Sequence, residues 1–167
     1  MGIDVRELRE RVIRPCLKLF NENSESAENL LLGTAAQESL MGKHCVCERT
    51  GGLGLYRITA EKHREVWDKY LVQFPDLASL QRGLASQHQF LKDPHAELIT
   101  NLCYSTGMAW IIYRQARVNF SKPTKLLTLA NLWATHFDNG AGDVRRAEDF
   151  IQSYRNFGLA NNKKLVA

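Results

Sequence analysis

The chain has 167 residues, of which 44% are hydrophobic and 24% are charged, and 22 basic against 18 acidic residues give a net charge of +4. This length and composition are typical of one globular domain with a substantial core, which we assign to residues 1–167. They argue against a nucleic-acid-binding protein, because the basic excess is modest and no basic stripe alternates with aromatic residues. No apolar run is long enough to predict a membrane-spanning segment.

The first helix is expected over residues 4–20, where apolar residues recur at helical spacing after a capping residue, Asp4. Pro15 removes a backbone donor and should bend this helix. The N-terminus shows no basic segment followed by an apolar run, so no export signal is predicted. If the target of the protein lies outside the cytoplasm, we therefore expect that another structure delivers it.

Residues 29–42 contain a single charged side chain, Glu38. The run is too short to span a bilayer and predicts a buried helix, capped by Ser24 or Ser26 and ended by Gly42 in a left-handed conformation. Burial and the helix dipole both disfavour a carboxylate near the C-terminal end of such a helix. We therefore expect a raised pKa for Glu38, which suits a general acid that protonates the leaving oxygen of a glycosidic bond.

Two other interpretations of Glu38 stay open from the helix alone. The side chain could lie on the solvent face, or it could bind a loop for purely structural reasons. The residues that follow Glu38 favour the catalytic interpretation.

Three glycines in four positions, Gly51, Gly52 and Gly54, follow this helix. Such a cluster marks a backbone that turns tightly or approaches another group closely, and we expect a short irregular or β-like segment through Ile58. Thr59 can cap the next helix, which Pro75 should end.

The remainder of the chain alternates apolar helical patterns with breaks, while residues 85–92 fit no single pattern. The fold class expected is therefore mainly α, with one short β-like segment after the Glu38 helix. Asp143 can cap the last helix, Gly158 can end it, and residues 161–167 are expected to form a frayed tail. Further helices are expected over residues 76–84, 93–118, 124–137 and 143–158.

The cysteines do not suggest a disulfide framework, and reduced thiols are expected, although Cys16 and Cys103 could meet in space. The run His44-Cys45-Val46-Cys47 invites a metal interpretation, but no second close Cys/His pair completes four ligands. We predict no metal and no cofactor.

The order Glu38-Ser39, then a loop, then a glycine-rich segment over residues 52–58 resembles the lytic transglycosylase and goose-type lysozyme family, whose pattern is Glu-Ser on a helix followed by Gly-Leu-x-Gln-Ile. Most of the chain is similar to small phage proteins of lysozyme-like fold. The stretches that carry this second likeness are Val12-Ile13-Arg14-Pro15, Leu30 to Ser39, Gly54-Leu55-Tyr56, Thr59-Ala60 with His63, and Ala147-Glu148-Asp149-Phe150-Ile151.

The resemblance implies a peptidoglycan glycosidase in which Glu38 protonates the oxygen between N-acetylmuramic acid and N-acetylglucosamine. In a lytic transglycosylase the same carboxylate then takes the proton of the sugar's own 6-hydroxyl group. In a lysozyme, water attacks and a second carboxylate is usual. No acidic residue soon after Glu38 stands out, which favours the single-acid mechanism. The residues that the resemblance assigns to the sugar cleft are Ser39, Gly52, Gly54, Leu55, Tyr56, Arg57, Phe137 and Asp138.

Two positions depart from the family pattern. Arg57 stands where glutamine is usual and has no side-chain acceptor. Phe137-Asp138 stands where a Tyr-Asn pair is usual, so the phenol expected near the acid is missing. Core packing is the favoured alternative explanation of Phe137, and a surface charge or an ion pair with Glu48 is the alternative for Arg57.

These departures leave two functions open. One is a phage-borne, cell-wall-cleaving enzyme whose partners are the glycan strand and other proteins of a tail or baseplate. It would be a component of the virion or, before assembly, lie in the host cytoplasm. The alternative is a structural virion protein that keeps the lysozyme-like fold without activity. A gel assay for peptidoglycan clearing separates the two.

Overall fold

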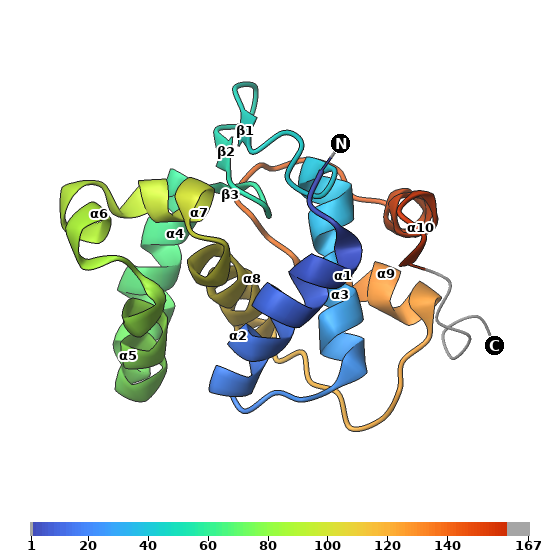
Figure 1. The fold of residues 1–167 in the computed structure, drawn as a ribbon, viewed down its shortest axis with the longest axis horizontal. Coiled ribbons are helices and arrows are strands. Elements are labelled where there is room, and N and C mark those ends of the chain that lie inside the picture. The colour runs from blue at the N-terminus through green and yellow to red at the C-terminus, as the bar shows by residue number, and fades with distance from the viewer. Residues whose placement is uncertain (1, 160–167) are drawn as a thin grey trace.

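The computed structural model describes residues 2–159, in which helices dominate and one small sheet is present, so the mainly α prediction is confirmed (Figure 1). None of the helices within these residues has the length and hydropathy that crossing a bilayer requires. The tail predicted for residues 161–167 lies outside the described residues.

The N-terminal helical stretch comprises α1 (Val5–Glu7), the π-helical segment η1 (Leu8–Ile13) and α2 (Arg14–Leu19). Asp4 caps it as predicted, because its carboxylate accepts the Glu7 amide. Pro15 lies just after the π-helical segment, at whose end the Arg14 amide donates to the carbonyl of Arg9, five residues back.

The central helix α3 (Glu25–Ser39) begins at Ser24, whose hydroxyl accepts the Ala27 amide. It ends three residues before the predicted Gly42, because Leu40 already has a left-handed backbone with φ 52°. Gly42 does have the predicted left-handed conformation, with φ 79°. The chain therefore turns away from the helix axis closer to Glu38 than the sequence indicated.

The predicted β-like segment is a three-stranded antiparallel sheet of β1 (Val46–Cys47), β2 (Gly52–Leu53) and β3 (Ile58–Thr59), in the order β1-β2-β3. Gly52 stands opposite both Cys47 and Thr59 in the register. The sheet lies beside the C-terminal end of α3 (Figure 1).

Thr59 caps α4 (Ala60–Glu65), which continues through the π-helical η2 (Val66–Tyr70) and the 3-10 segment η3 (Leu71–Gln73). Pro75 then opens α5 (Pro75–Leu84) as a first-turn residue. The segment that fitted no pattern contains α6 (Gln87–Lys92).

The single helix predicted over residues 93–118 is wrong. The chain forms η4 (Pro94–Ala96), α7 (Glu97–Thr100) and α8 (Leu102–Gln115), separated at Asn101. Asn101 has an extended backbone, its side-chain oxygen caps α8 at the Tyr104 amide, and its Nδ2 donates to the Leu84 carbonyl. One polar side chain thus ends one helix and begins the next.

The last two helices are α9 (Leu126–His136) and α10 (Ala147–Asn156). The predicted cap of α10 by Asp143 is wrong, since Arg146 occupies the cap position and Asp143 binds Arg49 instead. Gly158 has the left-handed backbone expected after the helix, with φ 69°.

The core surrounds α3, which packs against η1, α9 and α10 (Figure 1). Residues from Ser26 to Ala36 of α3 are all buried. α10 approaches closely because Gly33 has no side chain: a Cβ there would lie 2.1 Å from the Phe150 ring. This packing holds the C-terminal turn of α3, with Glu38, against the segment between α9 and α10.

Candidate functional site

The Glu38 side chain projects from the last turn of α3 and is only 10% exposed. Of the interpretations left open by the sequence, the solvent-facing one is wrong. The carboxylate instead lies under side chains from α9 and from the segment that joins α9 to α10.

Three side chains donate hydrogen bonds to this carboxylate. Oε1 accepts from the Trp133 indole at 3.1 Å and from the Arg145 guanidinium at 2.6 Å. Oε2 accepts from Asn139 Nδ2 at 3.0 Å. Both carboxylate oxygens therefore accept hydrogen bonds, and one of the three donors carries a full positive charge.

Burial raises the pKa of Glu38, as the helix predicted, while the charge of Arg145 and the hydrogen bonds from Trp133 and Arg145 act in the opposite direction. Burial prevails, so the carboxyl group holds a proton more readily than an ordinary glutamic acid. Because Arg145 is the strongest opposing influence, displacing its guanidinium would raise the pKa further.

Arg145 is itself held in place. Its side chain is 11% exposed, and its guanidinium lies 4.9 Å from the centre of the Trp133 ring and 5.4 Å from that of Phe137. Stacking of a cation on aromatic faces adds to the ion pair. Arg145 therefore belongs to a buried ion pair.

The segment over residues 137–146 is anchored to the sheet and to α4. The Asn139 carbonyl accepts the Thr59 amide at 2.8 Å, and Arg49 in the β1–β2 loop forms an exposed ion pair with Asp143. These contacts place the Asn139 amide on Glu38.

Ser39 fastens the end of α3 to the glycine-rich segment. Its hydroxyl donates to the Leu55 carbonyl at 2.7 Å and accepts the Gly42 amide at 2.8 Å. Its side chain is fully buried. In this conformation Ser39 therefore positions the site and presents no surface to a ligand.

The glycines of the predicted cleft allow close backbone contacts. Gly54 has φ 74°, and a Cβ there would lie 1.6 Å from the Leu98 carbonyl oxygen, so the sheet can meet α7 only at a glycine. A Cβ on Gly52 would lie 2.8 Å from the Arg57 carbonyl oxygen. The glycine cluster predicted a close approach of the backbone to another group, and at Gly52 and Gly54 that group is the backbone of the protein itself.

Three further residues assigned to the cleft are buried. Leu55 belongs to the core, the Tyr56 hydroxyl lies 3.2 Å from Thr106 Oγ1, and Phe137 stacks on Tyr113 with ring centres 5.1 Å apart. Their side chains contact protein rather than solvent. For Phe137, the core-packing interpretation describes what the structure shows.

Arg57 and Asp138 are more accessible. Arg57 has a left-handed backbone with φ 48°, and its Nε donates to the His44 carbonyl instead of pairing with Glu48. Its charge also acts to lower the pKa of Glu38. Partial burial acts to raise the pKa of Asp138, but the Lys62 and Gly140 hydrogen bonds and nearby positive charges bring it below its ordinary range.

Two tyrosines of α8 have hydrogen-bond partners other than Glu38. Tyr104 binds His63 and Trp67, and Tyr113 binds Thr34. Among the described residues, the aromatic ring that donates a hydrogen bond to Glu38 is that of Trp133. Trp133 lies within the helix predicted over residues 124–137 and Asn139 lies just after it, and no local signal links either one to Glu38.

No group of three or more His, Cys, Asp or Glu side chains within residues 2–159 is arranged to hold a metal ion. The four cysteines are free thiols, and Cys16 Sγ lies 3.6 Å from the Cys103 carbonyl, so these two residues do meet in space. Burial raises the pKa of Cys16 to about 12.

Comparison of the chain with models of known protein families, with curated proteins and with solved structures gives no match.

Proposed function

We propose that the chain is a peptidoglycan glycosidase of lysozyme-like fold, in which Glu38 is the general acid. The observation that carries the proposal is the buried Glu38 carboxyl group, which stands at the end of a helix beside a small glycine-rich sheet and whose pKa burial raises. A carboxyl group with these properties suits proton donation to a glycosidic oxygen near neutral pH.

In the proposed reaction, the Glu38 proton passes to the oxygen between N-acetylmuramic acid and N-acetylglucosamine as the bond to the anomeric carbon breaks. The carboxylate that remains is an anion, and Trp133, Asn139 and Arg145 are placed to stabilise it. The carboxylate then accepts the proton of the 6-hydroxyl group, whose oxygen closes a 1,6-anhydro ring on the anomeric carbon.

This single-acid course is favoured over the two-carboxylate course because the acids near the site are engaged by cations. Asp138 pairs with Lys62 at 2.8 Å, and Asp143 pairs with Arg49 at 3.0 Å. A carboxylate held in this way is a poor base for activating water. The proposal also includes delivery by a virion, which detection of the protein in purified particles would test.

Clearing of peptidoglycan in a gel tests the activity. Wild type should clear the gel and Glu38→Gln should not, while Glu48→Gln, the same change at an exposed position in the β1–β2 loop, should match wild type. Mass spectrometry of the products should show anhydro ends, whereas reducing ends would assign the reaction to water.

One observation favours the second candidate function, a structural virion protein with a disused site. The Glu38–Arg145 pair is short and almost enclosed. The guanidinium must therefore move away and the carboxylate must take up a proton before Glu38 can act as an acid. Arg145→Met separates the candidates. In an enzyme this variant should shift the pH dependence of clearing upward, whereas failure of both wild type and Arg145→Met to clear at any pH between about 4 and 8 supports the structural role.

A further inference from the structure

The segment between α9 and α10 passes beside the small sheet and the C-terminal end of α3 (Figure 1). The first half of this segment, up to Gly140, is firmly anchored. Asn139 is 2% exposed and its carbonyl accepts the Thr59 amide. Asp138 accepts a hydrogen bond at 2.8 Å from the buried Lys62. A Cβ on Gly140 would lie 2.1 Å from Thr59 Oγ1, so this half packs directly on the start of α4.

The second half of the segment, residues 142–145, has a backbone that contacts little else. In the part of the chain that the structure describes, none of its backbone groups forms a hydrogen bond. The Val144 side chain is 92% exposed although it is apolar, and a Cβ on Gly142 would meet no atom within 4 Å. Few contacts and a solvated backbone are the properties of segments that open at low cost in free energy.

Two ion pairs hold this second half in place. One is the buried contact of Arg145 with Glu38. The other joins Arg49 in the β1–β2 loop to Asp143 through two hydrogen bonds of 3.0 and 3.1 Å, and these two side chains are 72% and 42% exposed. Exposed pairs of this kind contribute little to stability and are screened by salt. Closure of the segment over the carboxylate therefore depends mainly on the Arg145 side chain.

Gly142 and Arg146 mark the two ends of the part that can move. Gly142 has φ 70° and open space around it, and glycine changes between left- and right-handed backbone conformations without a steric penalty. Arg146 has an extended backbone at the start of α10. Hinges are commonly loop positions or helix ends of this kind. A rotation at these two positions carries Arg145 away from Glu38 and leaves Asn139 on the carboxylate.

We propose that residues 142–145 form an autoinhibitory latch, which closes on Glu38 through Arg145 and opens by rotation at Gly142. In the closed state, Glu38 Oε1 accepts hydrogen bonds from Arg145 and Trp133, so this oxygen is not free to carry the proton of a general acid. In the open state, the carboxyl group keeps its other two donors and is accessible to a glycan. The moving latch rests on the contacts alone, whereas its inhibitory role rests on the proposed function.

Hydrogen exchange of the Trp133 indole tests the latch, because this residue is 3% exposed and its N–H is bound to the carboxylate that Arg145 covers. Nuclear magnetic resonance follows the indole signals of the full chain in deuterated water, and Trp133→Phe assigns the signal. Arg49→Gln should speed this exchange about two- to fivefold, the factor expected for loss of an exposed ion pair. Arg11→Gln, which breaks a similarly exposed pair with Glu7 in the N-terminal helical stretch, should not.

A second variant tests the hinge. Gly142→Ala adds a methyl group for which there is space, but alanine disfavours φ 70°, so the closed state should lose and exchange at Trp133 should rise about fivefold or more. The indole of Trp110, which is buried in the core, should exchange at an unchanged rate in both variants. An unchanged Trp133 rate in Arg49→Gln and Gly142→Ala overturns the latch, and so does an equal change at Trp110.

Clearing of peptidoglycan tests the inhibitory role separately. Arg49→Gln should clear faster than wild type, by about the factor seen in exchange. Faster exchange without faster clearing overturns the inhibitory role and supports the moving latch. Absence of clearing in wild type and in every variant, with exchange as expected, overturns the proposed function and supports the latch.

Discussion

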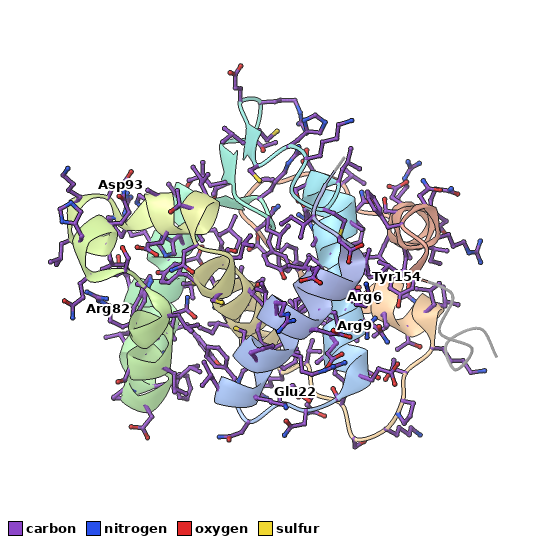
Figure 2. All side chains as sticks on the ribbon, in the orientation of Figure 1. Arg6, Arg9, Glu22, Arg82, Asp93 and Tyr154 are labelled. Carbon is purple, nitrogen blue, oxygen red and sulfur yellow. The ribbon has the colours of Figure 1, made fainter. Side chains whose placement is uncertain are left out.

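Two buried glutamates stand at opposite ends of α3 and differ in what surrounds them. Glu28, in the first turn, is 8% exposed and binds two guanidinium groups, Arg14 at 2.7 Å and Arg9 at 3.2 Å (Figure 2 labels Arg9). Glu38, in the last turn, is 10% exposed and binds one, Arg145.

The helix dipole makes the two ends unequal, since it favours an anion at the N-terminal end and disfavours one at the C-terminal end. Glu28 lies at the end that suits a negative charge, and its contacts with Arg9 and Arg14 join the N-terminal helical stretch to α3. Glu38 is placed where its charge is costly. The comparison teaches that burial of a carboxylate indicates function only when its position in the helix is considered.

The largest expected effect comes from the same substitution at both ends. Glu28→Gln leaves two cations without their anion and should lower the free energy of unfolding by about 3 kcal/mol. Glu38→Gln also leaves a buried cation, Arg145, without its anion, but it removes a charge that burial and the helix end disfavour, so its loss of free energy of unfolding at pH 7 should be smaller than that of Glu28→Gln. Urea unfolding measures both values. Equal losses in the two variants would show that both glutamates are structural.

The serines at the two ends provide a smaller contrast. Ser39→Ala leaves the Gly42 amide and the Leu55 carbonyl without their partner and should cost about 2 kcal/mol, with loss of clearing because Glu38 shifts. Ser24→Ala removes only a helix cap and should cost about 1 kcal/mol with clearing intact. Thermal unfolding and the gel assay measure the two effects. Retained clearing in Ser39→Ala would mean that Glu38 does not depend on this anchor.

The smallest effect is the pH dependence at the Glu38 end. The pKa of Glu38 is raised in the folded protein, so its carboxyl group adds to the free energy of unfolding when protonated. This added stability is fully present below the ordinary pKa of 4.5 and is lost as pH rises through the pKa of the folded protein. The stability difference between wild type and Glu38→Gln should therefore fall above pH 4.5, by at most about 1.4 kcal/mol per pH unit. A difference that rises instead would mean that Arg145 outweighs burial.

Local signals predicted much of the fold. The caps at Asp4, Ser24 and Thr59 each involve a side chain and an amide three residues on, so a short stretch of sequence specifies them. The glycine cluster likewise predicted the strand segment, because its backbone demands are local. Asn101 escaped prediction since its role depends on Leu84, a residue in another helix.

The site was only half predictable for the same reason. Glu38 stood out as a lone charge in an apolar run. Its three donors lie between 95 and 107 positions further along the chain, and nothing near Trp133, Asn139 or Arg145 marks them as its partners. Asp143 was misassigned because its actual partner, Arg49, is equally distant in sequence.

This separation has a consequence for biosynthesis. α3 and the sheet leave the ribosome well before residue 133, so every donor to the Glu38 carboxylate is still missing when these elements emerge. The acid acquires its enclosed state only when α9 and the segment before α10 arrive. A chain shortened before Trp133 would carry Glu38 as an ordinary surface acid, and completion of the C-terminal helices is the event that creates the site.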